Sequence, residues 1–231
     1  MKPIDAYNPW HWIGLLALLW YSLFGGLFMT LGVPFGRPPV FPSDHGQFVA
    51  FWSKLYVNVW LFAVIVLACL WRSGENFKSI GLVRPQLRTV VLLAIVLTVL
   101  AVLVSVVPEG VCLSRAATDA ERQIFPWTHV ERVFLLFAAC LTAPFCEELM
   151  YRGFLLAFFR ALVGLRSAIV LQALLFTYVH AVLGGWHRAG IPFFFGLLIA
   201  PLAIARDNLW PAIVVHFVLD AALLMVALLG P

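Results

Sequence analysis

The chain has 231 residues, of which 63% are hydrophobic and 11% are charged. A soluble domain carries roughly 25% charged residues, so the composition excludes a soluble globular protein and predicts an integral membrane protein with several spans. The formal net charge of +4 is modest, and the sequence contains no lysine- or arginine-rich block, Gly-rich phosphate loop or dinucleotide-binding motif. We therefore expect no nucleic-acid partner.

Seven apolar stretches predict membrane-spanning helices. In chain order they cover about 12–33, 48–71, 89–107, 132–159, 167–183, 190–205 and 210–229. No small-residue cleavage site follows the first stretch, so we interpret it as a retained span rather than a signal peptide. The expected fold is an all-α, polytopic transmembrane helical bundle of seven to eight spans, an eighth arising if the fourth stretch or the polar loop before it is split.

The loops predict an orientation. The loop 72–88 carries four basic residues, whereas Arg37 is the single basic residue of the loop between the first two stretches. Because lysine and arginine are enriched in cytoplasmic loops, we expect a cytoplasmic N-terminus and a multi-pass protein of the cell membrane. The loop 109–131 is the most polar part of the chain, and its charges of alternating sign predict a short surface helix.

The cysteines suggest neither a disulfide framework nor a thiolate zinc site. Cys69, Cys112, Cys140 and Cys146 form no CxxC pair. Three of them lie in apolar stretches, where a free thiol behaves as a small hydrophobic group. Cys146 adjoins an acidic pair, but no sequence signature of an activated thiol surrounds it, so we do not favour it as a nucleophile.

The fourth stretch carries two adjacent carboxylates and an arginine, namely Glu147, Glu148 and Arg152. A charged side chain at the centre of a membrane helix costs roughly 2.5–3.5 kcal/mol on insertion scales and usually faces a protein interior or a water-filled cavity. Glu148 and Arg152 are four residues apart and can pair, while Glu147 lies about 100° round the helix. Glu147 is therefore available as a general base. Pro144 predicts a kink nearby. The alternative is a buried ion pair that only pins helices.

Two further spans also carry ionisable groups. His180 lies in the fifth, and His216 and Asp220 lie four residues apart in the seventh. A lone histidine on an apolar helix is more often a core group than a ligand, but gathering all these groups in one cavity would satisfy them together. One carboxylate and two imidazoles can activate water and stabilise an oxyanion, which is the chemistry of amide hydrolysis in the membrane interior. No serine or threonine lies beside a base in these spans, so the sequence does not indicate a hydroxyl nucleophile.

Three motifs in this order resemble the CPBP family of intramembrane metalloproteases or glutamic proteases, which includes CAAX-prenyl-protease-2-like, bacteriocin-processing and abortive-infection proteins. The motifs are Glu147-Glu148-Leu149-Met150-Tyr151-Arg152, Phe176 to His180, and His216 to Asp220. The resemblance covers roughly residues 130–225. It predicts an N-terminal part, 1–129, and a catalytic helical core, 130–231, integrated in a single membrane domain.

The resemblance implies a glutamate-type endopeptidase that acts on a peptide or protein substrate, with lipidated substrates included, in the presence of membrane lipid. In this family pattern Glu147 activates a water molecule that His180 binds and orients. His216 and Asp220 would form the oxyanion hole. The supporting residues would be Glu148 and Arg152. The family often has asparagine where this chain has Asp220, and an aspartate can donate a hydrogen bond only when it is protonated.

Three alternatives stay open. Zinc could be bound by carboxylate and imidazole ligands, and the available ligands are Glu147, Glu148, His180 and His216. The HExxH motif is absent and Arg152 would repel a cation, so we expect no metal and no other cofactor. A non-catalytic protein could use the same polar cluster for partner binding or bacteriocin self-immunity. A proton-relaying transporter is disfavoured, because the two halves show no inverted repeat.

Overall fold

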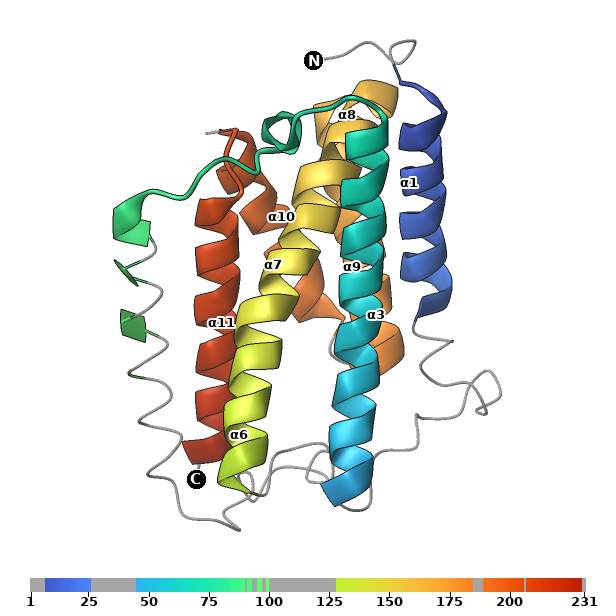
Figure 1. Ribbon diagram of the computed structural model, residues 1–231. Coiled ribbons are helices and arrows are strands. Elements are labelled where there is room, and N and C mark those ends of the chain that lie inside the picture. Colours follow the sequence, from blue (N-terminus) through green and yellow to red (C-terminus); the bar gives the residue numbers. More distant parts are fainter. Residues whose placement is uncertain are drawn as a thin grey trace. The chain divides into compact units, whose positions relative to one another are not determined.

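The computed structural model describes residues 7–25, 45–89, 91–92, 95–96, 99, 128–184, 189–205 and 207–229. Every regular element among these residues is a helix, as Figure 1 shows. The α-helices are α1 (Pro9–Trp20), α3 (His45–Arg72), α6 (His129–Leu135), α7 (Ala143–Glu147), α8 (Leu156–Val163), α9 (Leu165–Gly184), α10 (Gly190–Ile204) and α11 (Trp210–Leu229). The structure also contains the π-helices η2 (Tyr21–Gly25), η4 (Leu136–Thr142) and η5 (Glu148–Leu155) and the 3₁₀-helix η3 (Phe77–Ile80).

Three helical segments in the described part of the chain are long and apolar enough to cross a membrane: Trp52–Arg72, Val133–Val163 and Leu165–Val182. Gly190–Ile204 and Trp210–Leu223 are shorter apolar helices. The expected all-α membrane protein is therefore confirmed. The predicted span 89–107, the end of the first predicted span and the predicted surface helix in 109–131 lie mostly outside the described residues.

The chain forms two compact units. Unit 1 consists of Met1–Pro39, Asn58–Val83 and Cys146–Ala212, and unit 2 consists of Val40–Val57, Arg84–Phe145 and Ile213–Pro231. Glu147 and His180 therefore belong to unit 1, and His216 belongs to unit 2. The organisation into 1–129 and 130–231 stays a prediction.

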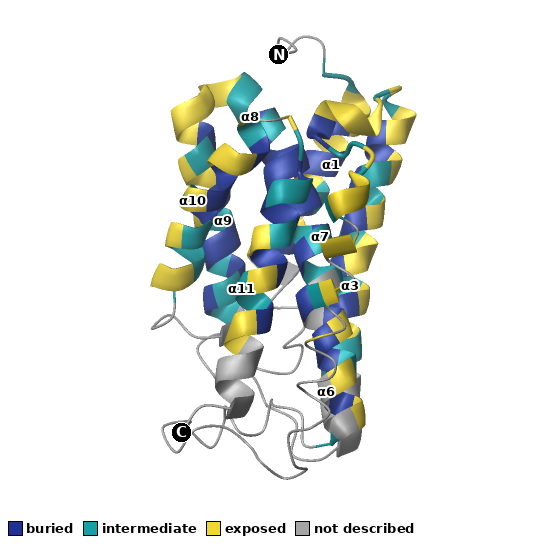
Figure 2. Ribbon diagram, turned by 90° about the vertical axis from the view of Figure 1, so that its left-hand side faces the viewer, coloured by how far each residue is buried: buried dark blue, intermediate teal, exposed yellow. Residues whose placement is uncertain are grey.

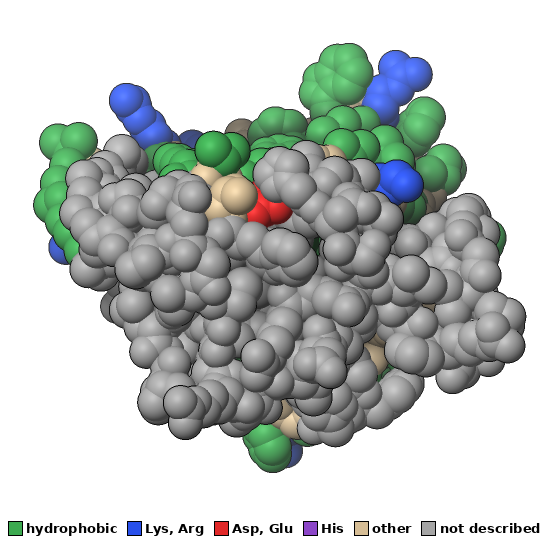
Figure 3. Space-filling view, turned by 90° about the horizontal axis from the view of Figure 1, so that it is seen from below, with side chains coloured by type: hydrophobic (Ala, Val, Ile, Leu, Met, Phe, Trp, Pro, Cys, Tyr) green, Lys and Arg blue, Asp and Glu red, His purple; other side chains and the backbone are tan. Residues whose placement is uncertain are grey.

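Helix α10 illustrates how unit 1 separates exposed apolar residues from packed ones. Ile191, Phe194 and Leu198 are 60–73% exposed and recur at helical spacing. The opposite face is buried and consists of Gly196, Ile199, Ala200 and Ala203. Figure 2 shows the same division of buried and exposed residues along the other helices. Exposed large apolar side chains in such numbers suit a lipid environment, and most of the described side chains visible in Figure 3 are likewise hydrophobic.

Two glycines in unit 1 occupy positions that favour glycine, one because two helices approach closely and one because of its backbone conformation. A Cβ atom at Gly196 of α10 would lie 2.9 Å from the Cβ of Ala173 in α9, so these two helices approach closely at small residues. Gly81 has a φ of 80°, a left-handed conformation that favours glycine. Its carbonyl accepts a hydrogen bond from Leu209 N at 2.9 Å, which ties the segment after α3 to the start of α11.

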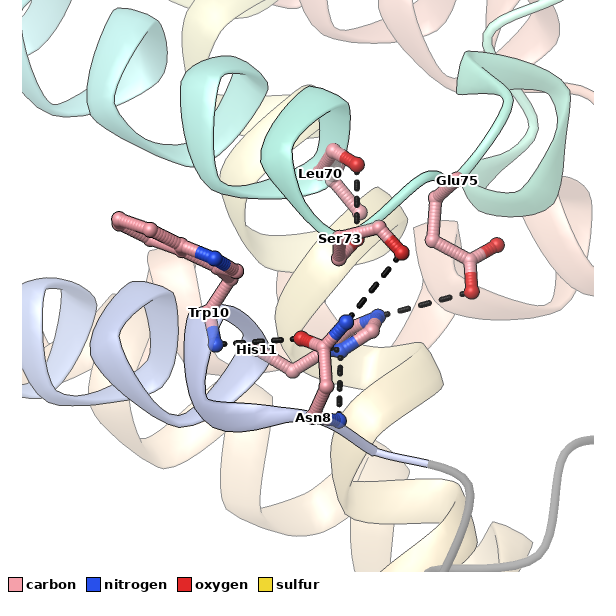
Figure 4. A network of polar contacts seen from close by, with 6 residues as sticks. All are labelled: Asn8, Trp10, His11, Leu70, Ser73 and Glu75. Atoms are coloured by element: carbon pink, nitrogen blue, oxygen red, sulfur yellow. Dashed lines mark hydrogen bonds and ion pairs between the residues drawn. The ribbon is translucent and has the colours of Figure 1, made fainter.

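The start of α1 is held by a polar network, drawn in Figure 4. Asn8 caps the helix by accepting a hydrogen bond from Trp10 N, and its amide donates to the Ser73 carbonyl at 3.2 Å. His11 Nε2 lies 3.6 Å from a carboxylate oxygen of Glu75. These contacts join the beginning of α1 to the end of α3.

In unit 2, the helical hydrogen-bond register changes just before Pro144. Ala143 N–H donates to the carbonyl of Ala138, five residues back, and the Thr142 hydroxyl donates to the same carbonyl at 2.7 Å. Proline has no N–H to donate to the turn that precedes it. The π-helix η4 directly precedes Pro144, and π-helical turns are frequent at functional sites. The predicted kink stays a prediction.

Candidate active site

The π-helix η5 places the acidic pair of unit 1 in two different environments. Glu148 is fully buried in η5, whereas Glu147 is the last residue of α7 and its side chain is 15% exposed. Leu156 N–H, at the end of η5, donates to the carbonyl of Tyr151, five residues back. The sequence predicted the different orientations of the two carboxylates but not the π-helical register.

Glu148 and Arg152 form the predicted ion pair. Glu148 Oε1 lies 3.0 Å from Arg152 Nη1, and both side chains are fully buried. The guanidinium also lies over two aromatic rings, 4.3 Å from the centroid of Phe176 and 5.7 Å from that of Phe195. A buried charge needs such partners because its desolvation is costly, and cation–π contacts contribute to satisfying it. Glu148 is thus charge-balanced inside the protein.

Glu147 faces an imidazole instead. His180 Nε2 of α9 lies 3.9 Å from Glu147 Oε2, and the His180 side chain is 37% exposed. This distance is too long for a direct hydrogen bond and suits a bridging water molecule, which both groups can contact. Glu147 and His180 thus lie close together, and both side chains are partly accessible.

The helix itself determines which nitrogen of His180 carries the proton. His180 Nδ1 lies 2.8 Å from the carbonyl oxygen of Phe176. A carbonyl only accepts, so Nδ1 donates and Nε2 of the neutral ring is left as an acceptor. The Phe176 ring also lies 4.2 Å from the imidazole, centroid to centroid. The spacing of four residues between Phe176 and His180 thus orients Nε2 toward Glu147.

Other residues that support this arrangement were not predicted from the sequence. The Tyr151 and Ser22 hydroxyls share a buried hydrogen bond of 3.0 Å, and the Tyr151 ring contacts Phe176 edge-on at 5.2 Å. Gln172 donates to the Gly196 carbonyl at 2.9 Å and so joins α9 to α10. Tyr151 lies inside the first motif, which could have indicated it, but nothing in the sequence distinguishes Ser22 from other polar residues.

His216 and Asp220 share a face of α11, as their spacing predicts. His216 Nε2 lies 3.6 Å from Asp220 Oδ2, with side-chain exposures of 4% and 27%. Both residues belong to unit 2. Their assembly with Glu147 and His180 in one cavity stays a prediction.

The described residues include no group of three or more His, Cys, Asp or Glu side chains arranged to hold a metal ion. The ligands considered for zinc are divided between the units, with His216 in unit 2 and the others in unit 1. Within unit 1, Glu148 already pairs with Arg152. The proteolysis assay with a chelator, described under the proposed function, distinguishes a metal-free site from a metal-dependent one.

Residues 129–222 match the family model described as type II CAAX prenyl endopeptidase, Rce1-like. The chain carries an Rce1-like domain. The match begins at the start of α6, ends within α11 and contains all six residues predicted for the site. It confirms the predicted resemblance to CAAX proteases over these residues, and the apolar helices described above agree with an integral membrane protein. No curated protein and no solved structure matches the chain.

Proposed function

We propose that this protein is an intramembrane endopeptidase that hydrolyses a peptide bond with a water molecule activated by Glu147. The observation that carries the proposal is the pair formed by Glu147 and His180, in which a partly exposed carboxylate faces an imidazole nitrogen that can accept a hydrogen bond. General-base catalysis requires this combination of reach and proton affinity. The Rce1-like domain supports the same reaction class.

In the proposed reaction, the water lies between Glu147 and His180. Its proton passes to the Glu147 carboxylate while its oxygen attacks the scissile carbonyl carbon, and His180 Nε2 orients it by accepting its second hydrogen. The carbonyl π-bond breaks and the carbonyl oxygen becomes an oxyanion. His216 and a protonated Asp220 would donate hydrogen bonds to that oxygen. When the intermediate collapses, the C–N bond breaks and the proton on Glu147 passes to the leaving amine.

The buried Glu148–Arg152 pair has a supporting role in this proposal. Because Arg152 neutralises Glu148 and is itself held by two aromatic rings, the pair fixes the helix turn that presents Glu147. The mechanism needs no metal ion. The proposed substrate is the tail of a membrane-associated peptide or protein, and the prenylated C-terminal sequences named in the family description are the first class to test. We place the protein in the cell membrane with its N-terminus in the cytoplasm.

A proteolysis assay on the purified protein in detergent tests the proposal. A panel of quenched peptides, some carrying a prenylated cysteine near the C-terminus, is incubated with wild type, Glu147→Gln and His180→Ala, each with and without a chelator. We expect cleavage by wild type that is insensitive to the chelator and is lost in both variants. Lys54→Gln removes an exposed charge of α3 and serves as the control that should retain activity.

Other outcomes would contradict parts of the proposal. Activity retained by Glu147→Gln would eliminate the glutamate base. Activity lost on chelation and restored by zinc would replace the metal-free mechanism with a zinc site. A biological effect that persists in Glu147→Gln, with no cleavage of any peptide by wild type, would favour the non-catalytic binding or immunity function.

A further inference from the structure

Unit 1 contains a second polar feature, a cavity of about 590 Å³. Its walls come from the start of α1, the segment after α3, the end of η5, helix α8 and the end of α10. Neither Glu147 nor His180 lines it. The cavity is therefore distinct from the pair proposed to activate water, although Arg152 contributes to its lining.

Three cationic residues line this cavity, Lys78, Arg152 and Arg160, and Arg152 is already paired with Glu148. The Arg152 side chain is fully buried, and its Nε and Nη2 atoms have no hydrogen-bond acceptor among the described residues. The buried Nε of Arg160 likewise has no acceptor in the described part of the chain. Neither Lys78 nor Arg160 forms an ion pair with a described residue. Buried donors without partners are costly, so these groups point to a ligand rich in acceptor oxygens.

Two carboxylates also line the cavity. Glu75 lies opposite His11, at 3.6 Å, as Figure 4 shows. Asp207 is exposed and follows the end of α10. Because Arg152 is already paired with Glu148, the cations available in the lining are Lys78 and Arg160. Of the two carboxylates, Glu75 already has an imidazole beside it. The buried Arg160 donor that lacks an acceptor favours an anion over a cation.

The cavity lies where membrane-spanning helices end. The candidate span Trp52–Arg72 ends just before the segment that contains Lys78, and Val133–Val163 ends just after Arg160. The Arg72 guanidinium lies 5.2 Å from the ring centroid of Trp10, and such Trp and Arg side chains mark the level of lipid headgroups. The apolar part of the lining includes Leu156 and Phe158, which could accommodate the start of an acyl chain.

We propose that this cavity binds a phosphate group, supplied either by the headgroup of a membrane phospholipid or by free phosphate. Lys78 and Arg160 hold the phosphate oxygens. A phosphate has more acceptor oxygens than a carboxylate, which suits two separate cationic side chains. Basic pockets at the ends of membrane helices are a known way of recognising lipid headgroups.

Calorimetric titration of the delipidated full chain in a neutral detergent tests the proposal. The probes are dihexanoyl phosphatidylglycerol, inorganic phosphate and uncharged dihexanoylglycerol. We expect saturable binding of at least one phosphate-bearing probe and none of dihexanoylglycerol. Lys78→Gln and Arg160→Gln should each weaken binding by about tenfold, the effect of losing one charge-assisted hydrogen bond, and Lys78→Arg should restore it relative to Lys78→Gln.

Arg166→Gln and Lys54→Gln are matched controls because both residues are exposed and neither lines the cavity. They should bind like wild type. Binding of the phospholipid alone assigns the site to a headgroup, and equal binding of inorganic phosphate assigns it to free phosphate. Absence of binding by both probes, or equal affinities in wild type, Lys78→Gln and Arg160→Gln, would overturn the proposal. Melting temperatures confirm that each variant is folded.

Discussion

Glu147 and Glu148 are neighbours in the chain, yet their surroundings in unit 1 differ in almost every respect. Glu148 is fully buried and lies 3.0 Å from a guanidinium, whereas Glu147 is partly exposed and faces an imidazole at 3.9 Å. The first environment stabilises a fixed charge, and the second leaves a carboxylate able to exchange a proton with water. The comparison teaches that a single residue step along a helix can separate a buried, ion-paired carboxylate from a partly exposed one.

The largest expected effect is on activity and involves Glu147 alone. Glu147→Gln removes the base without changing the size of the side chain, so we expect kcat/KM for a cleavable peptide to fall by about 10²–10⁴-fold. Because the side chain is partly exposed, the melting temperature in detergent should stay close to that of wild type. A melting temperature of Glu147→Gln far below that of wild type would mean that activity is lost through unfolding, which would contradict the expected difference between Glu147 and Glu148.

The second effect is on stability and involves the buried pair. Arg152→Met leaves Glu148 buried without its cation, so we expect the free energy of unfolding in detergent to fall by about 3–5 kcal/mol. The double variant Glu148→Gln/Arg152→Met should be more stable than Arg152→Met, because it removes both charges together. Denaturant titrations measure both values. Equal stability of Arg152→Met and wild type would contradict the structural role of the pair.

A smaller effect should follow from separating α9 and α10. Gly196→Ala places a methyl group 2.9 Å from the Cβ of Ala173, so we expect a loss of about 1–3 kcal/mol of stability from overpacking. Gly190→Ala is the matched control, since a Cβ atom there meets open space. The melting temperatures of the two variants provide the test. If both alanine variants melt alike, the two helices are not as closely packed as the structure indicates.

The smallest effect concerns the hydrogen bond between Tyr151 and Ser22. Tyr151→Phe keeps the ring against Phe176 but removes the hydroxyl, so we expect a loss of about 1 kcal/mol of stability. A double-mutant cycle with Ser22→Ala measures the coupling between the hydroxyls. Additive effects of the two substitutions would show that the hydrogen bond contributes no coupling, whereas a positive coupling energy would link η2 to the helix that carries the acidic pair.

The sequence predicted the contact between residues that lie close together in the chain. The pairing of Glu148 with Arg152 follows from helical periodicity, and the burial of the pair follows from the apolar run around it. The π-helical register was not predictable, because a shift from i−4 to i−5 hydrogen bonds leaves no distinct sequence pattern. Phe195 under the guanidinium was also missed, since it comes from a different helix.

The sequence by itself determined that the chain is a helical membrane protein, where its described spans lie and which motifs carry ionisable groups, because apolar length and helical spacing depend on neighbouring residues. The tertiary structure alone decided that Phe195 packs on Arg152, that Ser22 bonds to Tyr151 and that Lys78 and Arg160 line one cavity. These contacts join residues distant in the chain, and they depend on how whole helices pack against one another.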